Sequence, residues 1–194
     1  MKPKSTSTDE VKGDEWMAKD KRMVEHGYDP KIAQDPARGT ILMLDAFVDF
    51  EAADLAKIVE FAEVRNFAQI VLFPHHEKTA KNMGWTELPA FHKRLKAVDA
   101  MVDDLPSTAV RVTVDNWEEK RKKYTPLELI LRYFEEKYRP PYFLYVTDGY
   151  ANAMAQFASF DECMKKVRLV IDQKYDVPAH PKLTKVEHRW EYVE

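Results

Sequence analysis

Two short apolar runs, separated by one helix-length segment, constrain the fold more than any other feature of this chain. Residues 40–45 (TILMLD) and 69–74 (QIVLFP) are each long enough for one strand and almost continuously apolar. Runs of this kind are typical of strands that are buried on both faces. Between them, apolar residues recur at helical spacing over residues 50–66, and charged residues take the other face. The pattern predicts a strand, a crossover helix and a second strand parallel to the first.

Further apolar runs extend this alternation. Strand-like runs occupy residues 110–114, 142–146 and 167–171, and helical spacing appears between them at 91–104, 127–134 and 151–166. The sequence therefore predicts an α/β domain over residues 39–172, with a doubly wound, mainly parallel five-stranded Rossmann-like sheet. Residues 186–193 alternate only weakly, so the segment 173–194 is either a C-terminal tail or an edge strand.

The N-terminal segment, residues 1–38, differs in composition from the rest of the chain. It is rich in charged residues and has few large apolar ones, among them Trp16. Alone, it cannot bury enough apolar surface to offset the entropy lost on ordering. We interpret it as a charged tail and as a candidate contact arm for a protein partner.

Overall charge and cysteine content limit the classes of partner. A net charge of −3 produces no field that attracts nucleic acid, so a nucleic-acid partner is not expected. The single cysteine, Cys163, cannot form an internal disulfide, and no apolar run approaches the ~20 residues that span a bilayer. The sequence predicts an intracellular protein of a reducing compartment, without distinguishing cytoplasm from organelle matrix, and no membrane partner.

Polar side chains follow the predicted strands at their carboxyl ends, where open α/β sheets bind ligands. Asp148 comes just after the strand at 142–146, beside Thr147, and a carboxylate there commonly binds ribose hydroxyls. Turns also favour Asp before Gly, so the alternative is a turn residue. Asp45 and Asp49 follow the first strand and are candidate Mg²⁺ ligands, although capping of the next helix also favours acids there.

The order of these segments over residues 40–171 resembles the nicotinic acid mononucleotide adenylyltransferase family of the nucleotidylyltransferase superfamily. Three motifs carry the resemblance: Pro74-His75-His76-Glu77-Lys78 after the second strand, the helix Phe91-His-Lys-Arg94-Leu-Lys-Ala-Val98, and Tyr124-Thr125 followed by a strand ending in Thr147-Asp148. The resemblance implies a nucleotide ligand contacted by His75, His76, Lys78, Arg94, Tyr124, Thr125, Thr147 and Asp148. Because the strands are predicted to be parallel, their carboxyl-end loops should converge and place a small-molecule site between residues 46–54, the loop 74–78 and Thr147–Asp148.

The chain departs from the family where the family contacts phosphate. After its first strand the family has a Gly-rich turn and a His-x-Gly-His motif, whereas this chain has Glu51-Ala-Ala-Asp54. Two acids would repel a polyphosphate, and the missing glycines deny it close backbone approach. The family's C-terminal Ser-Ser-Thr-x-Ile-Arg motif also has no counterpart at residues 177–194.

Two functions follow from these departures. In the first, the domain has lost transfer chemistry and acts as a nucleotide-binding or assembly subunit, with no cofactor. In the second, it is an active nicotinate or nicotinamide mononucleotide adenylyltransferase with a non-standard phosphate site. Lys78, Arg94 or the basic run 120–123 would then replace the family's histidines, and Asp45 or Asp49 would hold Mg²⁺.

Overall fold

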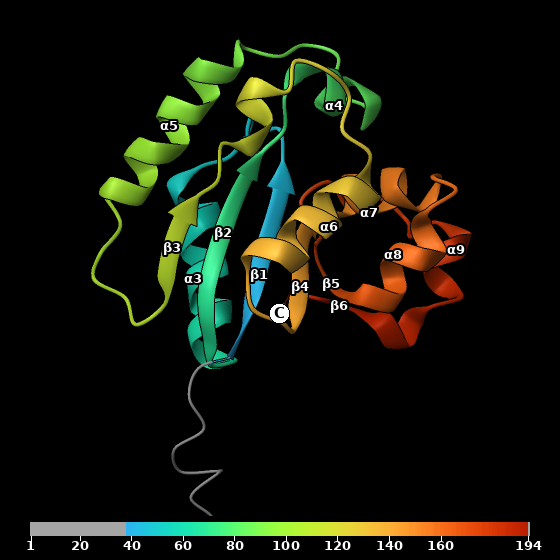
Figure 1. The fold of residues 1–194 in the computed structure, drawn as a ribbon. Helices are drawn as coiled ribbons and strands as arrows, with labels where there is room; N and C mark the ends of the chain where they lie inside the picture. Colours follow the sequence, from blue (N-terminus) through green and yellow to red (C-terminus); the bar gives the residue numbers. More distant parts are fainter. Residues whose placement is uncertain (1–37, 194) are drawn as a thin grey trace, which may run out of the picture. The chain divides into compact units, whose positions relative to one another are not determined.

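The computed structural model describes residues 38–193, so the predicted tail at 1–38 lies outside the described residues except for its last position. The chain divides into two units, Met1–Asp35 and Pro36–Glu194, and the described residues belong to the second. Their sheet has six parallel strands in the order β3-β2-β1-β4-β5-β6 (Figure 1). The strands are β1 (Arg38–Asp45), β2 (Phe67–Pro74), β3 (Arg111–Val114), β4 (Tyr142–Thr147), β5 (Val167–Asp172) and β6 (Trp190–Tyr192).

The α/β class and the parallel pairing of the first two strands are confirmed. Ile41 of β1 lies opposite Ile70 of β2 in a parallel ladder. The predicted number of five strands is wrong, because β6 adds a sixth strand, parallel to β5, at the edge of the sheet. This strand has only three residues and lies within the weakly alternating segment 186–193, for which an edge strand is one of the two predicted alternatives.

The helices connect the strands in alternation. They are α3 (Ala52–Val64), α4 (Glu77–Asn82), α5 (Phe91–Asp103), α6 (Leu127–Lys137), α7 (Asp148–Ala155), α8 (Phe160–Lys166) and α9 (Pro181–Thr184), with short 3-10 helices η1 (Trp117–Lys120) and η2 (Glu187–Arg189). The single helix predicted over residues 151–166 is wrong, because α7 and α8 are separate helices. The buried stripe of α7 includes Ala151, Met154 and Ala155, and helical spacing would continue it at 158 and 162. Phe160 and Met164 are buried instead, so the chain breaks to bring them to the core.

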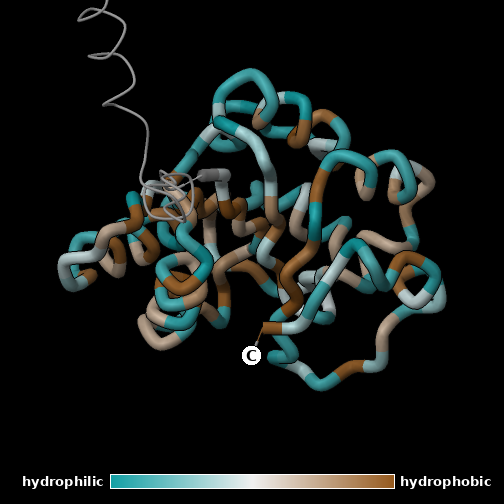
Figure 2. The backbone as a smooth tube through the Cα atoms, turned by 90° about the horizontal axis from the view of Figure 1, so that it is seen from below, coloured by the Kyte–Doolittle hydropathy of each residue, from teal (hydrophilic) through white to brown (hydrophobic). Residues whose placement is uncertain are grey.

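Alternate residues of β1, β2, β4 and β5 enter two separate cores. Ile41 and Met43 pack with α3 and α5 on one face of the sheet, while Leu42 and Leu44 pack with α6, α7 and α8 on the other (Figure 1). Figure 2 shows hydrophobic backbone segments in the interior and hydrophilic ones around the outside. Both faces of the sheet are therefore covered, which explains why its strands are almost continuously apolar.

The strand order fixes where a ligand crevice should lie. β1 and β4 are neighbours at the centre of the sheet, but the connection after β1 runs over one face and the connection after β4 over the other. In open α/β sheets a crevice forms where the connections diverge, beyond the carboxyl ends of those two strands. Asp45 and Thr147 end these strands and stand at this point.

Candidate functional site

The crevice at the carboxyl ends of β1, β4 and β5 is almost closed. Asp45, Thr147 and Asp172 end the three strands and line a cavity of about 10 Å³. A cavity needs roughly 10–15 Å³ to hold one water molecule, whereas small-molecule sites occupy roughly 300–1,000 Å³. The crevice therefore has room for about one water molecule and none for a nucleotide.

Lys174, in the loop after β5, closes the crevice. Its ammonium nitrogen lies 2.9 Å from Asp54 Oδ2 and also donates to the backbone carbonyl of Asp49. Burial is the largest single effect and opposes the charge, but the hydrogen bond and the negative charge of Asp54, together with nearby Tyr175 and Asp45, outweigh it, so the pKa of Lys174 is raised. Lys57 pairs in the same way with Asp172, at 2.7 Å. Both lysines near the crevice are thus neutralised by carboxylates of this chain.

Asp45 is one of two buried carboxyl groups that line the crevice cavity, the other being Asp172. Its Oδ1 accepts a hydrogen bond from the Phe47 N–H at 2.6 Å, and Phe47 adopts a left-handed backbone conformation with φ 55°. Burial raises the pKa of Asp45 from its ordinary value of 3.8 to about 6, against the opposing effects of that hydrogen bond and of nearby His75 and Lys174. The carboxyl group at the end of β1 is therefore half protonated at about pH 6.

His75 belongs to a fully buried polar network rather than to the crevice. Its Nε2 lies 2.7 Å from the Tyr150 hydroxyl, and the two rings stack at 5.7 Å. Its Nδ1 lies 3.3 Å from Glu118 Oε1, while Glu118 Oε2 accepts the backbone N–H of His76 at 2.6 Å. The side chains of His75 and Glu118 are 0% exposed. This network connects the chain after β2, the helix η1 after β3 and α7 after β4.

Arg94 of α5 is turned toward backbone carbonyls. Nη1 donates to the carbonyl oxygens of Ala46 (2.5 Å) and His75 (2.9 Å), which follow β1 and β2, and Nε donates to that of Pro89 (2.9 Å). The second terminal nitrogen, Nη2, is buried without a hydrogen-bond partner, and Glu77 Oε1 lies 3.9 Å from it. Arg94 therefore joins the ends of two strands to α5.

The carboxylate of Asp148, predicted to bind ribose, accepts hydrogen bonds from backbone N–H groups of this chain instead. Its carboxylate accepts the N–H of Gly149 (2.9 Å), Tyr175 (3.2 Å) and Val177 (2.9 Å). Only 4% of the residue is exposed, and Thr147 caps the same helix by accepting the Tyr150 N–H. Asp148 thus holds the loop after β5 against the start of α7.

Replacing Asp148 by alanine is expected to lower the free energy of unfolding by about 3 kcal/mol, because its two long-range hydrogen bonds, from the Tyr175 and Val177 N–H groups, contribute roughly 1.5 kcal/mol each, the lower end of the range for a charged acceptor. Urea unfolding followed by circular dichroism measures this. The matched control is Asp161→Ala, an exposed carboxylate in the first turn of α8. Equal, small losses in the two variants would contradict the structural role of Asp148.

The other predicted contacts lie away from the crevice cavity. His76 caps α4 and lies 3.1 Å from Glu77, and Thr125 is buried, where its N–H donates to Thr79 Oγ1 at 3.1 Å. Lys78 stands in the first turn of α4, and Tyr124 is 36% exposed. None of these four residues lines the cavity with Asp45, Asp49 and Thr147. The residues predicted to contact a nucleotide are therefore spread over different parts of the domain and do not gather around this cavity.

Sequence reasoning missed Asp172 and Lys174 of the crevice and Glu118 of the buried network. Asp172 directly follows the strand predicted at 167–171, so the rule about carboxyl ends already pointed to it. Lys174 follows two residues later and could have been examined by the same rule. Glu118 lies in a charged stretch, and nothing in its neighbours distinguishes it from the exposed Glu119.

The predicted metal ligands and membrane topology can be compared with the structure for residues 38–193. Asp45 and Asp49 line the same small cavity, but in the described residues no three His, Cys, Asp or Glu side chains gather closely enough to hold a metal ion.

Within residues 38–193, no helix has both the length and the apolar character needed to cross a membrane.

The fold and the crevice together define a Rossmann-like α/β domain, a class that binds ligands at the carboxyl ends of its strands. Among solved structures, the chain is similar to Plasmodium falciparum nicotinic acid mononucleotide adenylyltransferase complexed with NaAD, with a TM-score of 0.62 and 10% sequence identity. The match covers 80% of this chain and 74% of that chain. At this identity the likeness is one of fold. No protein-family model matches the sequence, and neither does any curated protein.

Proposed function

We propose that this chain is a nucleotidylyltransferase-like domain that has lost transfer chemistry and acts as a binding or assembly subunit. One observation carries the proposal. Lys174 closes the crevice at the carboxyl ends of β1, β4 and β5 by hydrogen bonding to Asp54 and to the Asp49 carbonyl. The similarity of fold and the three motifs that resemble the adenylyltransferase family support a common origin with those enzymes.

The charges around the crevice support the loss of chemistry. Nucleotidyl transfer needs cations or N–H donors aimed at the phosphates, because negative charge develops there. Lys174 is the only cation among the described residues lining the cavity, and it is paired with Asp54. Asp45, Asp49, Asp54 and Asp172 line the same cavity and would repel a polyphosphate.

The second candidate function, an active adenylyltransferase, is favoured by one feature of Arg94. Its Nη2 is buried and lacks a hydrogen-bond partner, so a phosphate oxygen could satisfy it. Activity would also require Lys174 to leave Asp54 and open the crevice. Lys174 would then be the cation closest to the phosphates.

A transfer assay separates the two functions. The full chain, incubated with ATP, Mg²⁺ and nicotinate or nicotinamide mononucleotide, is expected to release no pyrophosphate and to form no dinucleotide above the level without protein. The Lys174→Ala variant, prepared in the same way and assayed under the same conditions, serves as the control. Turnover by the natural chain that falls at least tenfold in this variant would establish the active enzyme and contradict the proposal. If the natural chain and the Lys174→Ala variant form the same small amounts of pyrophosphate and dinucleotide, the activity comes from a contaminating enzyme.

A further inference from the structure

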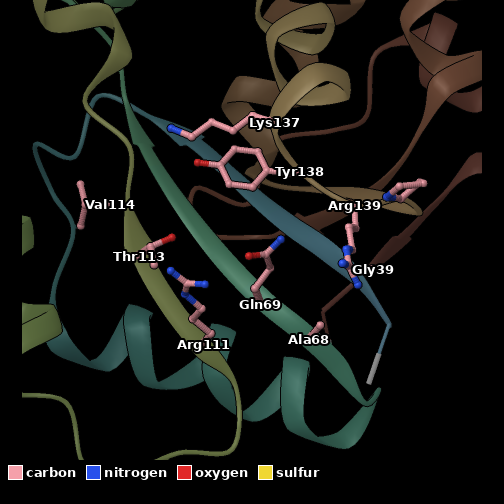
Figure 3. Close-up of a pocket in the computed structure, with 10 residues that line it drawn as sticks. Gly39, Ala68, Gln69, Arg111, Thr113, Val114, Lys137, Tyr138 and Arg139 are labelled. Atoms are coloured by element: carbon pink, nitrogen blue, oxygen red, sulfur yellow. The ribbon is translucent and has the colours of Figure 1, made fainter. Parts of the chain in front are cut away.

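A second cavity of the described residues lies at the other end of the strands from the crevice. Its volume is about 800 Å³, within the roughly 300–1,000 Å³ of small-molecule sites. Gly39, Ala68 and Arg111, at the first or second positions of β1, β2 and β3, line it together with residues at the end of α6 (Figure 3). It therefore opens on the amino-terminal part of the sheet.

The sequence explains why this part of the sheet is hollow. Helix α6 ends at Lys137, and the chain turns through residues 138–141 into β4 without covering the start of β1 and β2. A side chain at Gly39 would not fit, because its Cβ would lie 2.8 Å from the Pro141 carbonyl oxygen. The neighbouring Ala68 is also small. The space is thus left open where α6 ends and beside the small Ala68, whereas Gly39 is needed for the close approach of Pro141.

The charge of this cavity is positive. Arg111, Lys137 and Arg139 line it, and no carboxylate does. Lys137 pairs with Asp115 at 3.0 Å, so it is neutralised. The side chains of Arg111 and Arg139 are exposed, and neither has a hydrogen bond or ion pair to another residue in 38–193. Two guanidinium groups are therefore free to bind an anion, and their planar geometry favours bidentate contacts with phosphate.

Neutral groups complete the cavity. Tyr138 contributes a ring whose position is fixed by a 2.6 Å hydrogen bond from its hydroxyl to Asp115 Oδ2. The Gln69 side chain, held by a 2.8 Å hydrogen bond to Thr40 Oγ1, and the Thr113 hydroxyl lie on the floor between Arg111 and Tyr138 (Figure 3). Such a site offers cations for phosphates, an aromatic wall and polar groups for a sugar or base.

We propose that this cavity binds a phosphorylated small molecule of nucleotide size, with Arg111 and Arg139 contacting its phosphate groups. The proposal does not depend on the state of the crevice, which lies at the other end of the strands. It gives the domain a ligand site even though the usual position at the carboxyl ends is closed. The affinity should rise with the number of phosphates, because each adds charge facing the two guanidinium groups.

Calorimetric titration of the full chain with adenosine, AMP, ATP and inorganic pyrophosphate, without metal, tests the proposal. ATP is expected to bind more tightly than AMP, and adenosine to show no binding. Arg111→Ala and Arg139→Ala should each weaken ATP binding by about tenfold or more, since a hydrogen bond to a charged group contributes roughly 1.5–3 kcal/mol. Arg132→Ala is the matched control, because it removes an exposed arginine of α6 that does not line the cavity.

Several results would overturn the proposal. They are no binding of ATP or pyrophosphate, adenosine binding as tightly as ATP, and equal weakening by Arg111→Ala and Arg132→Ala. Binding that is lost in the Lys174→Ala variant but kept in Arg111→Ala would place the ligand in the crevice instead. Pyrophosphate binding as tightly as ATP would reduce the site to a simple anion site and contradict the role of Tyr138. The readout is binding, so it is independent of the transfer assay.

Discussion

Replacing Glu118 by alanine is expected to lower the free energy of unfolding by about 3–5 kcal/mol, because two hydrogen bonds to a buried charged acceptor are lost at roughly 1.5–3 kcal/mol each. Glu118 is 0% exposed and binds both His75 Nδ1 and the His76 N–H. Its removal leaves His75 buried with its bond to Tyr150 alone. Urea unfolding followed by circular dichroism gives the difference.

The chain offers a close control for this prediction. Glu119 is the next residue of η1, but it is exposed, so Glu119→Ala should change stability by about 0.5 kcal/mol or less. Glu118→Gln keeps one oxygen acceptor and should fall between the two. If Glu118→Ala and Glu119→Ala unfold at the same urea concentration, the buried network does not join the three strand ends.

The main elements of the sheet were predictable because their signals are local. The runs at 40–45 and 69–74 are continuously apolar, and their pairing follows from the helix-length segment between them. The break between α7 and α8 was not predictable in this way. It depends on which face of each helix packs against the sheet, and therefore on contacts between residues distant in the sequence.

The site was harder to predict than the fold. Position at a strand end identified Asp45 and Thr147, which line the crevice cavity. The same rule also selected Asp148 and His75, whose side chains hydrogen bond to other groups of the domain. The partners of Asp148 are backbone N–H groups 27 and 29 residues away along the chain, at Tyr175 and Val177. A sequence pattern does not contain these contacts, so it cannot separate a ligand-binding carboxylate from a structural one.

The stability of the domain is expected to fall as the pH rises from about 4 to about 6, because of Asp45. Burial raises its pKa from 3.8 to about 6, so between these values the folded chain holds a proton that the unfolded chain has lost. Protonation of Asp45 therefore favours folding, and its full contribution is present below pH 3.8 and lost above about pH 6. A shift of this size corresponds to about 3 kcal/mol.

Asp45→Asn isolates this effect from other titrating groups, because asparagine keeps an oxygen to accept the Phe47 N–H but cannot ionise. The free energy of unfolding of the variant, relative to the natural chain, should rise by about 3 kcal/mol between pH 4 and pH 7. Urea unfolding at each pH measures the difference, and Asp49→Asn, an exposed carboxyl group of the same turn, is the control. A constant difference between the Asp45→Asn variant and the natural chain across this range would show that Asp45 ionises without cost. The crevice would then be more hydrated than a cavity with room for about one water molecule allows.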